Sequence, residues 1–331
     1  MKWLVTGGAG YIGAHVVAAM QAAGEDVVVL DDLSTGDPQR LPDVPLVQGS
    51  VLDGDLVART VRQQRVQGVV HLAGKKQVEE SVRRPLLYYK ENVEGLRSLL
   101  QASLDGGVET FVFSSSAAVY GAPDVDLVTE ATPTEPVNPY GWSKLIGERL
   151  LADVAAATGL RYAALRYFNV AGSAAPELTD RGAANLVPMV FQQLSAGARP
   201  LVFGADYGTP DGTCVRDFVH VADVASAHVA AAQGLAAGRL DTLTANVGRG
   251  DGVSVRDMVQ RIRLATGTAD AEWAQPLVLP RRAGDPPRVV ASVGCIERSL
   301  GWRARWGVEE MVTSAWDGWV RTHGEVALSG R

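Results

Sequence analysis

The chain has 331 residues, of which 47% are hydrophobic and 21% are charged, and its formal net charge is −6. This length suits one large α/β unit or two closely joined domains, and the apolar fraction allows a sizeable core. The acidic balance excludes a general attraction to nucleic acid or to anionic membranes, so cations that bind phosphate would have to act locally.

The first predicted element is a short strand that leads into a glycine-rich turn and then a helix. Gly7, Gly10 and Gly13 stand in the spacing Gly-x-x-Gly-x-x-Gly. Such glycines allow a tight turn, a close approach of the backbone to a pyrophosphate and close helix–strand packing, while amides at the helix N-terminus face the anion. The next strand, residues 26–30, ends in Asp31, where an acid can bind an adenosine ribose and repel a 2′-phosphate. The pattern predicts NAD binding in preference to NADP.

Apolar runs alternate with helical segments through the first half of the chain. We expect strands at residues 3–5, 26–30, 46–48, 68–72, 110–113 and 161–167, and helices at about 15–23, 53–65, 85–104 and 138–157. Strands that alternate with helices indicate a parallel sheet covered on both faces. The predicted fold class is therefore α/β, with a doubly wound, Rossmann-type parallel sheet.

The alternation of strands and helices becomes irregular after residue 169, where strands are short and turns are frequent. Helices are expected from residue 185 and at 221–238, 254–266 and about 307–321, with a short strand at 201–203. We predict a smaller α/β substrate domain over the strand ends. The expected division is residues 1–169 plus about 221–247 for the dinucleotide-binding domain, and about 170–220 plus 248–331 for the substrate domain.

The candidate catalytic residues are a tyrosine and a lysine four positions apart, Tyr140 and Lys144, which share one helix face. A tyrosine pKa is ordinarily about 10, and a nearby ammonium together with an oxidised nicotinamide favours the phenolate. Tyr140 is thus a candidate base toward a sugar hydroxyl, and Lys144 can also hold the nicotinamide ribose. Ser116, at the end of the preceding strand, can bind the reacting hydroxyl. For an isolated pair of this kind, a solvated helix face is the alternative.

Two further observations bear on the compartment. Cys214 and Cys295 show no metal-ligand or redox spacing, which favours free thiols in a reducing compartment over a single disulfide. No apolar stretch is long enough to cross a bilayer, and the chain start is too short for a signal-peptide core. We therefore expect a cytoplasmic protein with no nucleic-acid, membrane or metal partner.

Longer motifs occur in an order that resembles a known family. They include Phe113–Ser116, Pro139–Gly141 with Lys144, Leu165–Asn169, Asp211–Asp217 and Arg281–Arg282 with Asp285, and with the glycine turn they span nearly the whole chain. Asp-Gly-Thr-x-Val-Arg-Asp and Leu-Arg-Tyr-Phe-Asn are far more specific than a glycine turn. The sequence resembles the extended short-chain dehydrogenase/reductases, and within them the UDP-glucose 4-epimerases.

The resemblance implies an activity and its residues. The activity is C4 epimerisation of UDP-galactose and UDP-glucose through a transient 4-keto sugar, with NAD retained and with Tyr140, assisted by Ser116, removing the 4-hydroxyl proton. The implied NAD contacts are Gly7, Gly10, Tyr11, Ile12, Gly13, Asp31, Asp32, Ser50, Val51, Leu72, Ala73, Lys76, Asn92, Ser114, Tyr140, Lys144 and Tyr167. The implied UDP-sugar contacts are Ser116, Tyr140, Phe168, Asn169, Asn185, Leu186, Phe203, Arg216, Arg282, Asp285 and Val289. A homodimer through the helices that begin near Pro85 and Tyr140 is also implied.

The sequence departs from the family pattern at three positions. Ser50 stands where an aspartate that contacts adenine is common, and Ala118 stands where a second hydroxyl is common near the sugar 4-hydroxyl. Val289 stands where a large aromatic residue narrows the sugar pocket. We expect a pocket that also admits UDP-N-acetylhexosamines, with ordinary packing of Val289 as the alternative.

Three other functions are weighed. A 4,6-dehydratase needs acidic groups directly after the serine run, where this chain has Ala117 and Ala118. A uronate 4-epimerase needs an extra cation, which Arg288 would supply. A non-catalytic NAD-binding scaffold usually lacks the tyrosine–lysine pair, and this chain has both residues.

Overall fold

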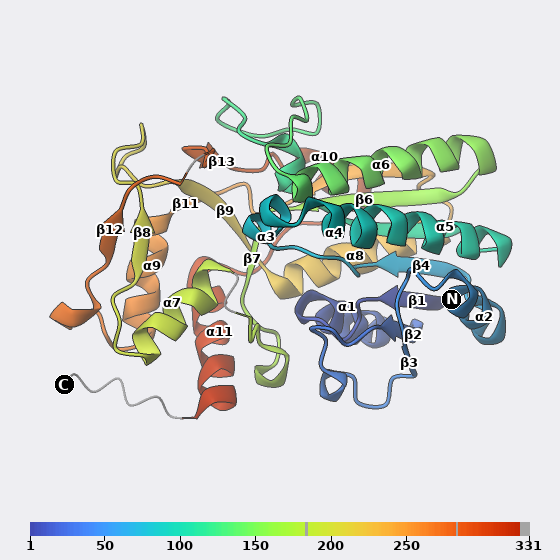
Figure 1. Ribbon diagram of the computed structural model, residues 1–331, viewed down its shortest axis with the longest axis horizontal. Coiled ribbons are helices and arrows are strands. Elements are labelled where there is room, and N and C mark those ends of the chain that lie inside the picture. Colours follow the sequence, from blue (N-terminus) through green and yellow to red (C-terminus); the bar gives the residue numbers. More distant parts are fainter. Residues whose placement is uncertain (183–184, 283, 325–331) are drawn as a thin grey trace.

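A computed structural model of the chain describes residues 1–182, 185–282 and 284–324. Figure 1 shows a larger lobe around a wide sheet and a smaller lobe built mainly from the later part of the chain. Among the described residues, no helix has the length and apolar character needed to cross a membrane. Cys214 is buried, Cys295 is partly exposed, and both thiols are free, as expected.

The larger lobe is built on a seven-stranded parallel sheet in the order β10-β6-β5-β4-β1-β2-β3. The strands are β1 (Lys2–Thr6), β2 (Asp26–Asp31), β3 (Leu46–Gln48), β4 (Gly68–His71), β5 (Thr110–Ser116), β6 (Arg161–Tyr167) and β10 (Thr242–Val247). The strand order runs outward in both directions from β1 and β4, and ligands bind at the carboxyl ends beside such a switch. The predicted doubly wound α/β class is confirmed.

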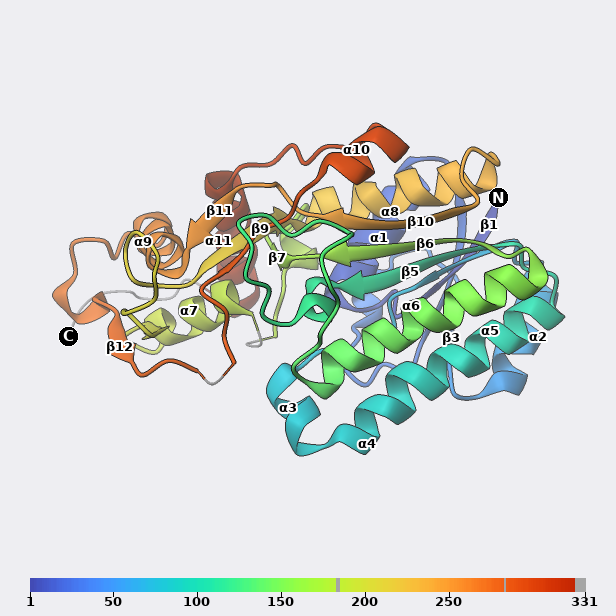
Figure 2. The ribbon, with the colours of Figure 1, turned by 90° about the horizontal axis from the view of Figure 1, so that it is seen from above.

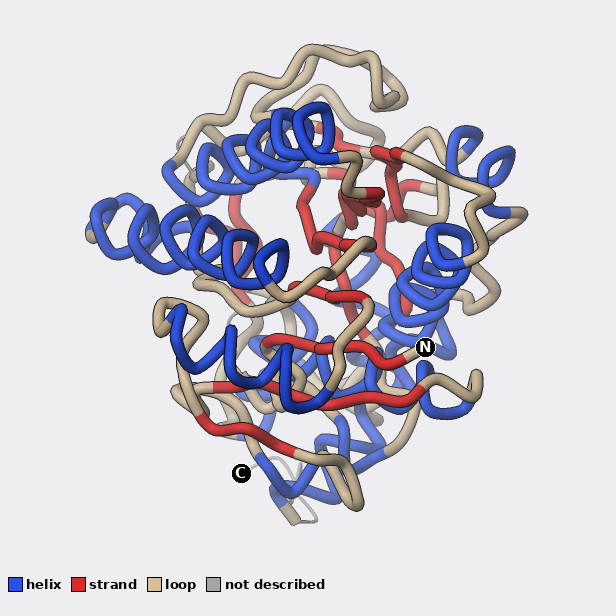
Figure 3. The backbone as a smooth tube through the Cα atoms, turned by 90° about the vertical axis from the view of Figure 1, so that its right-hand side faces the viewer, coloured by secondary structure: helices blue, strands red, loops and turns tan. Residues whose placement is uncertain are grey.

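Helices cover both faces of this sheet (Figures 2 and 3). One face carries α2 (Gly54–Gln64), α4 (Pro85–Tyr88), α5 (Gly95–Asp105) and α6 (Pro139–Thr158), and the other carries α1 (Tyr11–Ala22) and α8 (Val221–Ala236), which pack together. The helix predicted at 85–104 contains a π-helical segment, η2 (Tyr89–Glu94), and α3 (Val78–Arg83) before it was not predicted. The 3-10 turns are η1 (Pro38–Arg40), η3 (Ala117–Tyr120), η4 (Pro176–Leu178) and η5 (Glu272–Ala274).

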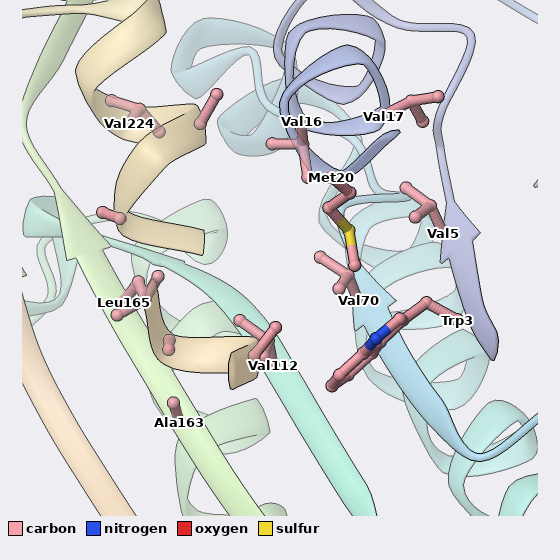
Figure 4. Packing of buried hydrophobic residues seen from close by; sticks show 14 of the residues in the cluster. Trp3, Val5, Val16, Val17, Met20, Val70, Val112, Ala163, Leu165 and Val224 are labelled. Atoms are coloured by element: carbon pink, nitrogen blue, oxygen red, sulfur yellow. The ribbon is translucent and has the colours of Figure 1, made fainter. Parts of the chain in front are cut away.

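The core of the larger lobe lies between the sheet and its helices. Figure 4 shows Trp3, Val70 and Val112 of three strands packed toward Met20 of α1, and all four side chains are fully buried. Parallel strands are buried on both faces, which explains their nearly continuous apolar runs. Each buried large apolar side chain contributes about 1.5–3 kcal/mol, so this core fixes the sheet whose strand ends carry the candidate site.

The smaller lobe contains the sheet β11-β9-β13, with β7 paired to β9, and a separate pair β12-β8. Its elements are β7 (Asn169–Ala171), α7 (Leu186–Ser195), β8 (Leu201–Phe203), β9 (Val215–His220), β11 (Gly252–Ser254), α9 (Val255–Ala265), β12 (Leu277–Leu279), β13 (Arg288–Val289) and α11 (Val308–His323). The strands β9, β11, β12 and β13 were not predicted, because they are short and lack a clear apolar alternation. A further helix, α10 (Gly294–Leu300), packs on β10 and was also not predicted.

Candidate functional site

The glycine turn lies at the switch between β1 and β4. Gly7 has φ +72°, and a Cβ built on it would lie 2.6 Å from the backbone nitrogen of Ala73, just beyond β4. A Cβ on Gly13 would lie 2.1 Å from the carbonyl oxygen of Gly7, so α1 packs directly on the turn. Gly10 is the N-cap of α1, and no side chain of the described residues caps this helix. The uncapped amides at the N-terminus of α1, next to a turn that carries no side chains at its three glycines, fit a pyrophosphate, so the residues present fit NAD.

Asp31 holds the turn from the end of β2. Its Oδ2 accepts a hydrogen bond from the amide of Ala9, and its Oδ1 accepts one from the amide of Leu33, both at 2.9 Å. Burial raises the pKa of Asp31, and these two amides oppose the rise. Each carboxylate oxygen keeps a lone pair for a ribose hydroxyl. Ser50 is instead turned onto its own loop, where its Oγ accepts from the amide of Leu52 at 3.2 Å.

Asn92 binds the loop that follows β4. Its Oδ1 accepts from the amide of Lys75 at 2.8 Å, and its Nδ2 donates to the carbonyl of Lys75 at 3.0 Å and to Oγ of Ser143 at 2.9 Å. Asn92 lies in the π-helical segment, a distortion that is frequent at functional sites. Its side chain therefore fixes the loop after β4 against α6.

Three predicted catalytic side chains meet where β5 ends and α6 begins. Asn138 caps α6 by accepting from the amide of Gly141 at 2.9 Å, which places Tyr140 in the first turn, as predicted. The hydroxyl of Ser116 accepts from the amide of Ala118 at 3.2 Å, and its interaction with Tyr140 lowers the pKa of that tyrosine. Lys144 follows one turn later on the same helix face.

Lys144 is directed into the larger lobe. Its Nζ donates to the carbonyl of Ser114 at 2.9 Å and lies 5.1 Å from the ring centroid of Phe113. An ammonium has three donors, so two remain for other partners. The Ser114 hydroxyl is in contact with Nε2 of His228 at 2.8 Å, so Ser114 is fixed from both sides of the sheet.

Burial determines the charge states of Tyr140 and Lys144. It raises the pKa of Tyr140, and the hydrogen bond with Ser116 offsets only part of the rise. Burial lowers the pKa of Lys144 to about 8, against the opposing charge of Glu148. In the protein alone, burial therefore outweighs the stabilisation of the Tyr140 phenolate that is expected from Lys144. The sequence also predicts that the positive charge of an oxidised nicotinamide stabilises the Tyr140 phenolate.

The smaller lobe presents the predicted nucleotide contacts in two pairs. Arg216 forms an ion pair with Asp285. The guanidinium of Arg282 lies over the ring of Phe203, 3.9 Å from its centroid. Asn185 lies at the N-cap of α7, where its Nδ2 donates to a neighbouring carboxylate at 2.7 Å. Arg216 and Arg282, which are predicted to bind a diphosphate, thus each lie beside another predicted nucleotide contact.

Val289 joins the two lobes. It is paired in register with Arg216 on β9, and it is buried in an apolar cluster with Phe168 and Tyr120 of the larger lobe. Its neighbour Arg288 donates from Nε to the carbonyl of Asp126 at 3.0 Å. Adjacent strand residues point to opposite faces, so Arg288 does not lie on the face of Val289, and the cation needed for a uronate is not supplied there.

The remaining predicted contacts differ in exposure. The structure places in or against the apolar interior Tyr11, Ile12, Val51, Leu72, Ala73, Tyr167 and Leu186, and it leaves exposed Asp32, Lys76 and Asn169. Tyr11 donates from its hydroxyl to the carbonyl of Gly172 at 2.6 Å, and it thereby connects α1 to the chain after β7.

Sequence reasoning missed a buried ion pair behind the catalytic helix. Nη2 of Arg166 on β6 lies 2.5 Å from Oε2 of Glu148 on α6, and both side chains are less than 10% exposed. The signal that could have found it is spacing, because Glu148 follows Lys144 by four residues and so shares its face.

Comparisons with known proteins agree with this geometry. The model of the NAD dependent epimerase/dehydratase family matches residues 3–248. The chain belongs to that family. A UDP-glucose 4-epimerase of Azospirillum brasilense is 46% identical over 304 residues, which cover 90% of this chain and 86% of that protein.

Solved structures of epimerases are also similar. A UDP-glucose 4-epimerase of Stenotrophomonas maltophila, crystallised with bound NAD and formylated UDP-arabinopyranose, is 40% identical with a TM-score of 0.90, and the match covers 97% of this chain and 98% of that one. The UDP-Glc/GlcNAc 4-epimerase of Campylobacter jejuni is 34% identical with a TM-score of 0.84, and the match covers 96% and 98%.

Proposed function

We propose that this protein catalyses the NAD-dependent interconversion of UDP-galactose and UDP-glucose at C4 of the sugar. The observation that carries the proposal is the gathering of Tyr140, Ser116 and Lys144 at the carboxyl end of β5, where α6 begins, together with a glycine turn that fits a dinucleotide. The Azospirillum relative is a UDP-glucose 4-epimerase, and the Stenotrophomonas enzyme was crystallised with NAD and a UDP-sugar.

The chain's own residues divide the work of the reaction. Bound NAD would supply the acceptor and donor of the C4 hydride, held by the glycine turn, Asp31 and Lys144. Ser116 and Tyr140 hold the sugar 4-hydroxyl, and Oη of Tyr140 takes its proton as the 4-keto sugar forms. Tyr140 returns that proton once the keto sugar has presented its opposite face. Lys144 stabilises the phenolate between the two transfers.

The smaller lobe holds the nucleotide while the sugar turns. Arg216 and Arg282 bind the diphosphate, because guanidiniums form bidentate, charge-assisted bonds with phosphate oxygens. The other nucleotide contacts are Asn169, Asn185, Leu186, Phe203 and Asp285, and Phe168 and Val289 line the sugar side. A diphosphate fixed in this way leaves the hexose free to present either face to Tyr140.

A panel of substrates tests the proposal. Purified protein is incubated with UDP-galactose, UDP-N-acetylglucosamine and UDP-glucuronate in parallel, and products are separated by anion-exchange chromatography. We expect the first to give UDP-glucose and the uronate to remain unchanged. Inactivity on UDP-galactose with NAD still bound would instead support a non-catalytic scaffold.

We infer that the sugar pocket also admits N-acetylhexosamines. Val289 is a small residue in the cluster that borders the site, beside Tyr120 and Phe168. The Campylobacter relative is a UDP-Glc/GlcNAc 4-epimerase. We therefore expect UDP-N-acetylglucosamine to give UDP-N-acetylgalactosamine. The absence of this product at high enzyme concentration would refute the inference.

A homodimer is proposed through the helical face beside α6. Large apolar side chains are exposed there on α3, α4 and α6, which lie side by side in Figure 2. They are Val82 (62% exposed), Leu86 (82%), Trp142 (43%) and Ile146 (37%). A gathering of this kind is typical of an interaction surface. Light scattering is expected to give the dimer mass, and Leu86→Glu with Ile146→Glu is expected to give the monomer mass.

We propose the domain division at residues 1–169 plus 221–247 against 170–220 plus 248–331. The pairing of β10 with β6 in the large sheet supports the return of the chain to the first domain. α10 packs on β10 from within the second range. The cytoplasm is the proposed compartment, supported by two free thiols.

A further inference from the structure

A buried carboxylate with no role in the mechanism above lies one helical turn beyond Lys144. Glu148 is 7% exposed. Arg166 binds both of its oxygens, with Nε 2.9 Å from Oε1 and Nη2 2.5 Å from Oε2. The hydroxyl of Ser115 donates to Oε1. A buried carboxylate held by three hydrogen bonds is a rigid part of the site.

Glu148 connects the two elements that carry the reacting side chains. It is on α6 with Tyr140 and Lys144, and residues four apart on a helix are neighbours. Its partner Ser115 precedes Ser116 on β5. The carboxylate therefore fixes the strand end that positions Ser116 against the helix that positions Tyr140.

The groups around the Lys144 ammonium differ in charge. The titratable groups that face Lys144, or face its partners, are Tyr140 and Glu148 on α6, His71 on β4, Tyr120 on η3, Tyr162, Arg166 and Tyr167 on β6, and His228 on α8. Burial lowers the pKa of His71 to about 3 and that of His228 to about 4, so both rings are neutral. Among these described groups, Glu148 is the only carboxylate.

We propose that Glu148 is a positioning residue of the epimerase: it keeps the ammonium of Lys144 charged and holds the serine strand end against α6. This rests on the proposed function, in which the charge on Lys144 stabilises the Tyr140 phenolate. Burial already brings the pKa of Lys144 down to about 8, and the Glu148 charge opposes that fall. Without this charge, the pKa of Lys144 falls further, so the ammonium loses its proton at a lower pH.

The pH profile of kcat tests the proposal on the NAD-loaded enzyme. An opposite charge close to an ionisable group shifts its pKa by about 1–3 units. In Glu148→Gln, the alkaline limb of the kcat profile is therefore expected to move about 1–3 pH units lower. KM for UDP-galactose is expected to stay unchanged, because the nucleotide contacts lie in the other lobe. An alkaline limb that stays at its wild-type position would overturn the proposal.

A paired variant separates the effect on Lys144 from simple loss of structure. Glu148→Gln alone leaves Arg166 buried without its partner, which destabilises a fold strongly. The double variant Glu148→Gln/Arg166→Gln removes both charges and is expected to recover the melting temperature while its alkaline limb remains displaced. If melting temperature and limb recover together, Glu148 only neutralises Arg166 and the proposal is wrong.

Two matched variants complete the design. Tyr120→Phe removes the contact between Nη1 of Arg166 and the Tyr120 hydroxyl, which is 2.8 Å long, and the hydrogen bond that this hydroxyl donates to Oδ1 of Asn246, but it leaves both contacts between Arg166 and Glu148 in place. Its alkaline limb is expected at the wild-type position. Glu148→Asp retains the charge, and we expect its limb to lie closer to the wild-type position than that of Glu148→Gln. A limb displaced equally in Tyr120→Phe and Glu148→Gln would assign the effect to Arg166 instead.

A spectroscopic readout needs no turnover. The ionisation of Tyr140 is obtained from the ultraviolet phenolate band, as the difference between each NAD-loaded protein and its Tyr140→Phe counterpart. A neutral Lys144 no longer supports the phenolate, so Glu148→Gln is expected to raise the pKa of Tyr140. An unchanged or lower pKa would contradict the proposal. If the wild type does not epimerise UDP-galactose, the proposed function fails, while this titration still decides the role of Glu148.

Discussion

Alanine at two glycines of the turn separates the folding of the turn from its binding of NAD. At Gly13, a Cβ would lie 2.1 Å from the carbonyl oxygen of Gly7, where ordinary contact begins at 3.4 Å. At Gly10, it would lie 3.2 Å from the same oxygen. The backbone at Gly10, with φ −74° and ψ 174°, also suits alanine. The first substitution therefore disturbs the protein itself far more than the second, which requires the turn to move by only a few tenths of an ångström.

The structure sets the size of each effect. Gly13→Ala must push α1 and the turn apart by about 1.3 Å, and overpacking of this kind costs about 1–3 kcal/mol. An unfolding entropy of about 2.1 cal/mol/K per residue gives about 0.7 kcal/mol/K for 331 residues, so the melting temperature falls by about 1.5–4 °C. Gly10→Ala is expected to change it by less than about 1 °C, because the small displacement at the 3.2 Å contact is offset by the lower unfolded-state entropy of alanine.

NAD content gives the second readout. The Cβ at Gly10 occupies the space where the backbone would meet the pyrophosphate, so we expect NAD per protein, released by acid and quantified by chromatography, to fall at least about tenfold, a loss of about 1.4 kcal/mol. Gly208→Ala is the matched control, because a Cβ there meets no atom within 4 Å. Wild-type NAD content in Gly10→Ala with an unchanged melting temperature would refute this account of the turn.

Three further predictions concern catalysis, acid stability and specificity. Tyr140→Phe is expected to lower kcat by about 10²–10⁴-fold with UDP affinity retained by calorimetry, and a variant with full rate would refute the assigned base. The melting temperature is expected to fall steeply from pH 6.5 to 4, because burial holds the pKa of four described histidines far below the unfolded value of about 6.5. In this pH range these histidines bind protons in the unfolded state but stay neutral in the folded state, so a falling pH favours unfolding. These are His15, His220 and His228 at about 4 and His71 at about 3. Three buried carboxyls oppose the fall, because burial raises the pKa of Asp217 to about 6 and also raises that of Asp31 and Asp223. A flat profile would contradict the prediction. Val289→Tyr is expected to reduce turnover of UDP-N-acetylglucosamine about tenfold or more relative to UDP-galactose, and an unchanged ratio would assign Val289 to packing alone.

The larger lobe was predictable because its local signals agree with its fold. Continuous apolar runs mark the buried parallel strands, and caps mark the helices: Asp53 accepts from the amide of Leu56 and Asn138 from that of Gly141, each at 2.9 Å. The smaller lobe was predicted less well. Its strand β9 reads Val-Arg-Asp-Phe-Val-His, and Asp217 within it is fully buried because it accepts hydrogen bonds from distant backbone amides. Contacts of this kind depend on tertiary structure.

The site shows the same limit. The spacing of Tyr140 and Lys144 on one capped helix was readable from the sequence, and so was the serine run that ends β5. The charge states of these residues could not be predicted from the sequence, because burial determines them. Lys144 favours a phenolate when it is charged, but burial lowers its own pKa and so favours its neutral form. The Glu148–Arg166 pair joins a helix to a strand, and only the packed structure brings it beside the site.

Transfer of a label at C4 tests the central claim most directly. UDP-galactose with deuterium at C4 is incubated with the purified protein without added NAD, and the product is analysed by mass spectrometry and proton NMR. We predict UDP-glucose that retains deuterium at C4, because one cofactor removes and returns the same hydride within the closed site. No UDP-glucose, or UDP-glucose that has lost the label to solvent, would contradict the account.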